Sequence, residues 1–229
     1  MKTLNPYTLL AAGCAMLLAL GACDREPTDY REFLGGKESV YPGKPNNLKA
    51  SPGRDRVEFS WNPSADPSVK RYRITWNNGQ NAAMVDASTH DPAEFIKVVV
   101  PAVNEDRYEF ALYALDAAGN ISVPSPISVR TYGARYESGL NNRGVLSKWF
   151  ESETLVIQWA TADTVHTGSR IAYTDVNGQK KTYDVLPDAL ETRVPNCKAG
   201  EAVSVLSGYK PVTLAIDTFY ALKPDTLKF

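Results

Sequence analysis

The sequence predicts an all-β protein in which two tandem β-sandwiches follow a signal peptide and a tether. Short runs of alternating apolar and polar residues recur along the chain, and turn residues separate them at intervals typical of sandwiches. The composition of 229 residues, 43% hydrophobic and 22% charged, is that of one or two globular domains. With 25 Lys and Arg against 26 Asp and Glu, the sequence shows no basic footprint for a nucleic-acid partner.

Residues 1–22 form the predicted signal peptide. One charged residue, Lys2, precedes an uncharged stretch whose apolar core runs from Leu9 to Leu20. A membrane-spanning helix needs about 20 mostly apolar residues. The run is therefore too short to span a membrane and is typical of a signal sequence.

The apolar run ends in Leu20-Gly21-Ala22-Cys23. This motif resembles the lipobox of bacterial lipoproteins, in which small residues admit the peptidase and the cysteine thiol receives a diacylglycerol. The resemblance implies that Cys23 is lipidated and that its acyl chains anchor the protein to the membrane. The alternative is ordinary secretory cleavage after Ala22.

Acidic residues follow the cysteine directly, in Cys-Asp-Arg-Glu-Pro. Asp24 and Glu26 resemble the export signal that sends lipoproteins to the outer surface in Bacteroidota-type bacteria. The resemblance implies a lipid anchor in the outer membrane with the protein facing outward. The alternative is a protein that faces the periplasm.

Residues 23–43 form the predicted lipidated N-terminus and tether, because Pro and Gly pairs interrupt any regular period. Cys14 leaves with the signal peptide and Cys23 carries lipid, so Cys197 stands alone and no intrachain disulfide is available. Cys197 is interpreted as a semi-buried small hydrophobe. An intermolecular disulfide is the alternative.

Residues 44–132 form the first predicted sandwich. Apolar and polar residues alternate in three runs, which indicates strands with one buried face. The predicted inward residues are Val57, Phe59 and Trp61, then Tyr72, Ile74 and Trp76, then Tyr108, Phe110, Leu112 and Ala114.

These runs resemble the fibronectin type III domains, a class of immunoglobulin-like sandwiches. Trp61 ends the second strand, Tyr72 to Trp76 fill the third, and Tyr108 opens the sixth, which continues into Asp116-Ala117-Ala118-Gly119-Asn120. The resemblance covers about residues 44–132. It implies that Tyr108 forms a tyrosine corner, with its hydroxyl bonded to backbone a few residues upstream.

Residues 133–229 resemble a degenerate second fibronectin type III-like copy. Leu155 to Trp159 matches Val57 to Trp61, which places Trp159 where the first domain has Trp61. Asn177-Gly178 suits a two-residue turn because both central positions need positive φ, so residues 171–176 and 180–185 are predicted to form a hairpin. Residues 202–206 and 213–221 then complete the sandwich.

The mature chain is also similar to a domain-of-unknown-function family of Bacteroidota lipoproteins. The similarity rests on Tyr30 to Glu38, Tyr41 to Pro45, Asp66 to Val69 and Ile216 to Tyr220. It implies a location and an architecture, and such proteins look similar to accessory lipoproteins encoded beside glycan-uptake systems.

The sequence contains no common nucleophile, nucleotide or zinc motif, so it predicts no cofactor and no metal. His90 and His166 lie in turn-like contexts in different domains and are interpreted as solvated loop residues. Asn104-Glu105-Asp106 and Asp163 offer oxygen ligands but lack the spacing of a calcium loop. Turn chemistry accounts for both.

Glu151 and Glu153 raise the remote alternative of a hydrolase. A glycosidase acid and base must face each other across the sugar at about 5 to 10 Å. Residues two apart on one strand share a face and do not flank a substrate. The sequence therefore predicts that the protein is not an enzyme.

Ten per cent of the residues are aromatic, and flat exposed rings are surfaces on which sugars stack. The candidates for ligand contact are the pair Trp149 and Phe150, together with Tyr132 and Tyr136 at the junction between the halves. Against this, one ring of an adjacent pair must point into the core, and the two tyrosines could fill the contact between domains.

We expect a non-enzymatic surface lipoprotein that acts as an accessory binding or spacer component in glycan capture. Its expected partners are the membrane, through the lipid, and a glycan or co-encoded surface proteins. The alternative is a protein-interaction or adhesion module of the cell envelope, because fibronectin type III folds present loops and sheet edges to other proteins.

Overall fold

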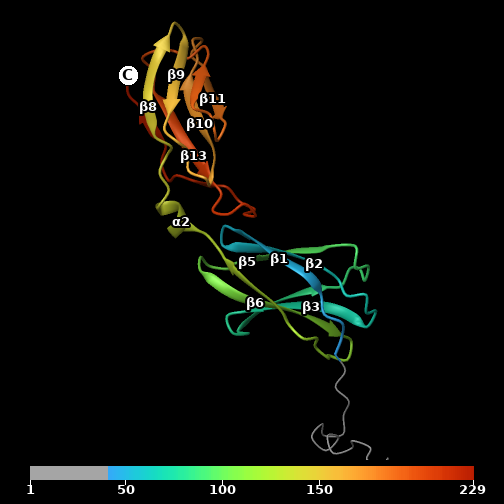
Figure 1. The fold of residues 1–229 in the computed structure, drawn as a ribbon. Coiled ribbons are helices and arrows are strands. Elements are labelled where there is room, and N and C mark those ends of the chain that lie inside the picture. Colours follow the sequence, from blue (N-terminus) through green and yellow to red (C-terminus); the bar gives the residue numbers. More distant parts are fainter. Residues whose placement is uncertain (1–40) are drawn as a thin grey trace, which may run out of the picture. The chain divides into compact units, whose positions relative to one another are not determined.

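The structure is a computed structural model that describes residues 41–229 (Figure 1). Its first sandwich consists of a three-stranded sheet, in the order β1-β2-β5, and a four-stranded sheet, in the order β4-β3-β6-β7. Neighbouring strands in both sheets are antiparallel. The strands are β1 (Asn46–Gly53), β2 (Arg56–Asn62), β3 (Val69–Trp76), β4 (Asn81–Asp86), β5 (Ile96–Pro101), β6 (Arg107–Asp116) and β7 (Ser125–Arg130).

Alternation along these strands builds the first core. The side chains of Trp61 in β2 and of Tyr72 and Ile74 in β3 are fully buried in it. The rings of Trp61 and Tyr72 meet edge to face with centroids 5.2 Å apart, an arrangement that adds to the burial of apolar area. Trp76 and Tyr108 are partly buried and pack against the same cluster.

The corner before β6 differs from the prediction. The ring of Tyr108 packs near Phe110, but no hydrogen bond of the Tyr108 hydroxyl is found among residues 41–229. Instead, the buried hydroxyl of Thr131 donates to the carbonyl oxygen of Asn104 at 2.5 Å and accepts from the backbone N–H of Asp106 at 3.0 Å. The predicted tyrosine corner is wrong, because a threonine directly after β7 already satisfies the backbone there.

The second sandwich consists of a three-stranded sheet, in the order β12-β9-β8, and a sheet in the order β11-β10-β13-β14 to which β15 adds by pairing with β13. The strands are β8 (Val145–Glu151), β9 (Thr154–Trp159), β10 (His166–Thr174), β11 (Lys180–Val185), β12 (Glu191–Val194), β13 (Val203–Tyr209), β14 (Phe219–Tyr220) and β15 (Asp225–Leu227).

The two sandwiches share one topology, to which the second adds the short strand β14. In each, the first, second and fifth strands form one sheet, and the third, fourth, sixth and last strands belong to the other. This is the fibronectin type III arrangement, so the predicted all-β fold of two tandem sandwiches is confirmed.

Trp159 anchors the second core, as Trp61 does the first. Its indole N–H donates to the hydroxyl of Thr192 at 2.9 Å. Cys197 lies in the same core, 1% exposed, and burial raises the pKa of its thiol. An intermolecular disulfide at Cys197 would therefore require this core to open.

The turn between β10 and β11 differs from the predicted two-residue turn. The connection spans five residues, 175–179, and Gly178 has a φ of +81° whereas Asn177 does not adopt a positive φ. The carboxylate of Asp175 accepts the backbone N–H groups of Asn177 at 2.9 Å and Gln179 at 2.8 Å. This bridge holds the longer turn, so only the glycine has to be left-handed.

The end of the chain also differs from the prediction. Of the predicted strand 213–221, only β14 forms, and residues 210–218 make a loop. The backbone N–H of Ile216 in that loop donates to the carbonyl oxygen of Pro52 at 2.9 Å. This segment therefore bonds to the first sandwich and does not extend the sheet.

Residues 41–229 form one compact unit, in which the short helix α2 (Ala134–Ser138) connects the sandwiches. The Glu105 carboxylate accepts the backbone N–H of Arg135 at 2.8 Å and of Tyr136 at 3.2 Å. Glu137 of the helix accepts both ends of the Arg54 guanidinium. The predicted turn residue Glu105 thus caps the first turn of the helix.

Candidate functional site

Trp149 and Phe150 are adjacent in β8 and face opposite sides of its sheet. Phe150 packs on the core cluster, and its ring centroid lies 5.0 Å from that of Phe229. Trp149 is paired with Val156 on β9. The residues on either side of Val156 along β9 point into the core, so Val156 and Trp149 point outward. Of this pair, only Trp149 is placed to contact a ligand.

Trp149, Val156 and Arg193 form one outward row across β8, β9 and β12. Val156 is 0% exposed although it faces away from the core. The half-buried Trp149 and the stem of Arg193, its neighbours on either side, therefore cover it. The indole N–H of Trp149 also donates to Glu151 at 2.9 Å, so the ring is held in place against the sheet.

Glu151 links the tryptophan to Arg193. Arg193 donates from Nη1 to Glu151 at 2.7 Å and from Nε to Glu191 at 3.0 Å. The hydrogen bond from Arg193, followed by that from Trp149, lowers the pKa of Glu151. A general acid needs a raised pKa instead, so this carboxylate is suited to orient its neighbours and not to donate a proton.

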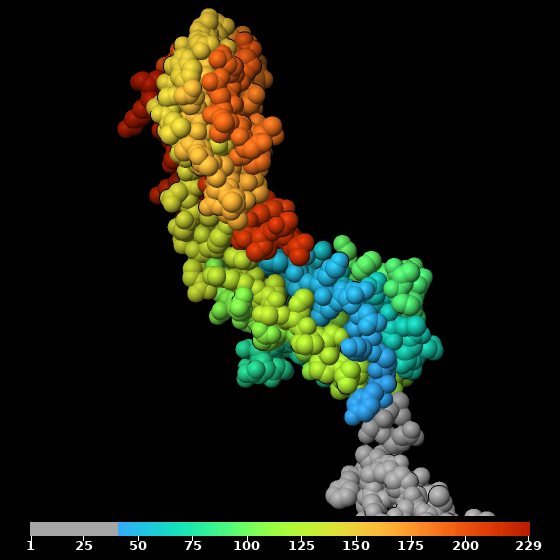
Figure 2. Space-filling model, in the orientation of Figure 1, coloured from blue at the N-terminus to red at the C-terminus, as the bar shows by residue number. Residues whose placement is uncertain are grey.

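Glu153 does not share a strand with Glu151, contrary to the prediction. Ser152 has a φ of +57°, and Ser152 and Glu153 make the turn that joins β8 to β9. Because the chain reverses there, the two carboxylates do not lie on one strand face. No deep cleft is visible on the face shown in Figure 2.

Two donors beside the ring have no protein partner among residues 41–229. The amide oxygen of Gln158 accepts from Ser147 at 2.7 Å, which leaves its NH₂ group open. Nη2 of Arg193 is open as well. We call Trp149, Glu151, Gln158 and Arg193 the Trp149 surface. A ring with hydroxyl-binding donors beside it suits a ligand that has an apolar face and polar edges.

The sequence alone indicated only Trp149 and Glu151 of this surface. Gln158 and Arg193 come from β9 and β12, and the register of those strands against β8 brings them together. Their outward positions in alternating runs were a signal, but cross-strand neighbours are set by tertiary pairing.

Tyr132 and Tyr136 meet each other and Phe219. Their ring centroids are 5.1 Å apart, and that of Tyr136 lies 5.2 Å from Phe219 at an interplanar angle of 86°. Both tyrosines are partly buried, and burial raises the pKa of Tyr136. The structure thus places them in an aromatic cluster at the connection between the sandwiches, where neighbouring rings occupy much of their surface.

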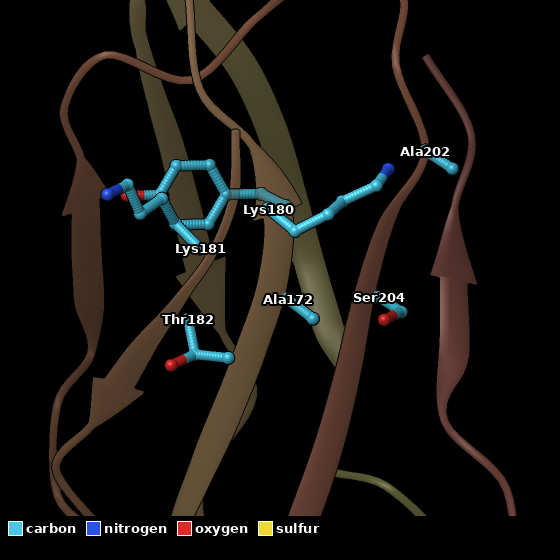
Figure 3. Close-up of a pocket in the computed structure, with 7 residues that line it drawn as sticks. Ala172, Lys180, Lys181, Thr182, Ala202 and Ser204 are labelled. Atoms are coloured by element: carbon cyan, nitrogen blue, oxygen red, sulfur yellow. The ribbon is translucent and has the colours of Figure 1, made fainter. Parts of the chain in front are cut away.

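A hollow of about 590 Å³ lies over β10, β11 and β13 (Figure 3). Its floor is the row of small residues Thr182, Ala172 and Ser204, which are paired directly across the three strands. Lys180 extends over the sheet toward Ala202 in Figure 3, and its Nζ donates to Thr174 at 2.8 Å. The hollow is open and shallow, and its floor offers two hydroxyl groups.

His166 is buried, so the expectation of a solvated loop histidine is wrong for this residue. It begins β10 and is 6% exposed. Nε2 lies 3.0 Å from the hydroxyl of Ser169, which lies 2.7 Å from that of Ser207, and Nδ1 lies 3.2 Å from the carbonyl oxygen of Pro187. These partners satisfy both ring nitrogens, so the histidine is a packed polar residue. His90 is partly buried, with Nε2 2.8 Å from the carbonyl oxygen of Val69.

The other candidate ligand groups act within turns. The Asp163 carboxylate accepts the backbone N–H of Val165 at 3.1 Å, and that of Asp106 accepts the N–H of Arg107 at 2.8 Å. Between residues 41 and 229, no three His, Cys, Asp or Glu side chains are grouped as metal ligands. In the same part of the chain, no helix is both long and apolar enough to cross a membrane.

A family model described as a domain of unknown function, DUF4998, matches residues 23–219 of this sequence. The chain belongs to that family. The DUF4998 match includes both sandwiches as far as β14. No protein among the curated sequences matches the chain.

Several solved structures are similar to this DUF4998 protein. A segment of two fibronectin type III domains from chicken tenascin is 16% identical, with a TM-score of 0.35 over 80% of this chain and 97% of that one. The FN1–FN3 domains of chicken CNTN1 are 14% identical, with a TM-score of 0.49 over 83% and 66%. The fn3 domain of human collagen alpha-1(XX) is 22% identical, with a TM-score of 0.33 over 44% and 94%.

The predicted signal peptide, Cys23 and most of the tether lie outside the described residues. The end of the predicted tether is described, and there the backbone N–H of Gly43 donates to Asp66 at 2.8 Å. This contact joins the tether to the first sandwich beside the loop that begins at Asp66.

Proposed function

We propose that this DUF4998 protein is a non-enzymatic lipoprotein of the bacterial outer surface that serves as an accessory binding or spacer component in glycan capture. Cys23 carries the lipid that anchors it to the outer membrane, in the manner of Bacteroidota lipoproteins. The Trp149 surface binds the sugar, and the first sandwich holds that surface away from the membrane.

The observation that carries this proposal is the exposed part of Trp149 beside two open donors. Val156 supports the ring from below and Glu151 holds its N–H, so little freedom is lost when a ligand stacks on it. Gln158 and Arg193 then supply donors for sugar hydroxyl groups. The pKa of Glu151 is lowered, whereas the general acid of a glycosidase needs a raised pKa, which supports binding without hydrolysis.

A glycan array probed with the intact chain tests the binding role. We expect Trp149→Ala to weaken binding of the selected glycan at least about tenfold, because the stacking surface is removed. The matched control is Phe95→Ala, which removes another exposed aromatic ring, 55% exposed, from the first sandwich. Failure of the unaltered protein to bind any glycan would end the capture role and leave the spacer role.

The anchor is tested in cells by labelling with a fatty-acid analogue and by adding protease outside. We expect the native protein to take up label and to be digested, and Cys23→Ala to take up none. Label with protection from protease would place the protein on the periplasmic face. An unlabelled native protein would contradict lipidation.

The second candidate function is a protein-interaction module, and β4 favours it. This strand lies at the end of its sheet, and its only charged residue is the final Asp86. Met84 at its outer face is 47% exposed. An edge without a charge or proline along most of its length can accept a strand from another chain. We would test this function by crosslinking to a defined partner. A crosslink that is lost in Met84→Lys and persists in Trp149→Ala would favour it.

A further inference from the structure

The arginines of the first sandwich divide into two groups. Residues 41–229 contain ten arginines, and six of them donate side-chain hydrogen bonds to protein acceptors. The remaining four have neither an ion pair nor a side-chain hydrogen bond in this part of the chain. They are Arg71, Arg73, Arg107 and Arg130.

All four side chains project from the outer face of the β4-β3-β6-β7 sheet. Tyr72 and Val129 point into the core, so their strand neighbours Arg71, Arg73 and Arg130 point outward. Arg107 is paired directly with Arg130 and shares its face. Between residues 41 and 229, the four arginines without an ion pair therefore lie on one face of one sheet. We call it the arginine face.

Packing within the sandwich does not account for this arrangement. Arg107 and Arg130 are directly opposed across β6 and β7, and like charges in that position destabilise a sheet. Arg73 has its Nε buried without a partner while its guanidinium lies 5.4 Å from the centre of the Tyr113 ring. Arg130 likewise lies over an aromatic ring, 5.6 Å from the centre of Tyr132. These arginines form no ion pair with an anionic group among residues 41–229, and a cation without such a partner is suited to an external one.

The face is long and carries other side chains among the arginines. Asp86 is paired with Arg71, Tyr113 is paired with Arg73, and Glu109 lies two residues from Arg107 along β6. Arg71 is paired with Leu115, and Arg107 lies eight residues back along β6, so the backbone positions that carry the arginines extend over about 26 Å at roughly 3.3 Å per residue. Thr75 and Ala111, paired between the two ends, leave the middle of the face low. A linear ligand with repeated anionic groups fits this spacing better than a compact ion.

We propose that the arginine face binds a linear anionic polysaccharide, one that carries carboxylate or sulfate groups along its length. The guanidinium fork donates two parallel hydrogen bonds to such groups. Met84 is the one exposed large apolar side chain on these four strands. The face therefore lacks the apolar centre of a protein interface. The proposal rests on the proposed function only in taking the ligand to be a glycan, since the Trp149 surface belongs to the other sandwich.

The test measures binding of the intact chain to dextran sulfate and to polygalacturonate, with uncharged dextran as the reference polymer. We expect both anionic polymers to bind and dextran not to bind. The variant R71Q/R73Q/R107Q/R130Q should weaken binding at least about tenfold, because four charge-assisted contacts are lost. Arg→Lys at the same four positions keeps the charge and removes the fork, and should retain binding at low salt but lose it as salt rises.

The matched control is K44Q/K49Q/K223Q/K228Q, which removes the same net charge from four exposed lysines elsewhere. It should bind as the unaltered protein does. An equal loss in both glutamine variants would mean non-specific attraction and would overturn the proposal. So would binding to vesicles that contain anionic lipid without binding to either polymer. The two proposals can fail separately. If Trp149→Ala still binds the anionic polymers and the unaltered protein binds no neutral glycan, the arginine face is supported and the Trp149 surface is not a glycan site.

Discussion

His166 shows what a buried titratable residue does to stability. Burial, opposed by a hydrogen bond to Pro187, lowers the pKa of His166, and the nearby Arg143 lowers it further. The unfolded chain therefore takes up a proton near pH 6.5 that the folded chain resists. The stability that comes from the neutral imidazole is complete above that pH and is lost as the pH falls below it.

We therefore predict that His166→Gln reduces the loss of stability between pH 7.5 and pH 5.5. Urea unfolding at both pH values gives the free energy of unfolding at each, and the difference between the two measures this loss. His90→Gln is the matched control, because it removes the other histidine of the sequence. A pH dependence that follows the His90 variant instead would contradict the assignment.

Burial also lowers the chemical reactivity of the Cys197 thiol. Its thiol is 1% exposed and burial raises its pKa, so little thiolate is present and none is accessible. We predict that Cys197 is alkylated only after denaturation. Peptide mapping by mass spectrometry, with and without urea, measures this directly. Rapid alkylation under native conditions would show that the second core opens more readily than its packing implies.

At the scale of the element, the two glycines of the β10–β11 hairpin differ in what surrounds them. Gly178 has a φ of +81° and open space where a Cβ would lie, whereas Gly168 has a φ of +127° and a Cβ there would lie 2.7 Å from the carbonyl oxygen of Val185. Alanine at 178 meets only backbone strain. Alanine at 168 meets strain and a clash with a fixed backbone atom.

We predict that Gly178→Ala lowers the free energy of unfolding by about 1 kcal/mol and Gly168→Ala by at least about 2 kcal/mol. The two variants change the same atoms in the same hairpin, so each controls for the other. Chemical denaturation of both measures the difference. Equal losses would mean that β11 shifts to accept the new methyl group.

At the scale of the whole molecule, Asp217 ties the loop after β13 to the first sandwich. It accepts the backbone N–H of Arg54 at 2.8 Å and the Arg56 guanidinium at 2.5 Å. Burial raises the pKa of Asp217, but hydrogen bonds from Arg56 and Arg54 outweigh it, and the net effect is a lowered pKa. The contact is therefore present at neutral pH and is lost as the pH falls through that lowered value.

We predict that Asp217→Ala exposes the connection at residues 139–144 to protease, with cleavage faster by about tenfold than in the unaltered protein. The matched control is Asp184→Ala, which breaks an ion pair with Arg170 inside one sheet and should leave cleavage unchanged. Limited proteolysis at neutral pH measures both rates. Equal rates in all three proteins would mean that Asp217 does not hold the two sandwiches together.

The sequence by itself determined the fold class, the two tandem sandwiches and the inward faces of β2, β3 and β6, because alternation of apolar residues is a local property of each strand. It also identified the pair Trp149 and Phe150 as candidates and left open which of the two points outward. Only the tertiary structure decided that Phe150 packs on the core and that His166 is buried. It also decided that Thr131 replaces the tyrosine corner and that residues 210–218 leave the sheet. These features depend on which strands lie side by side and in what register. Strand pairing and register also bring Gln158 and Arg193 beside Trp149 and place four unpaired arginines on one sheet. A local sequence pattern does not contain the information on which strands pair.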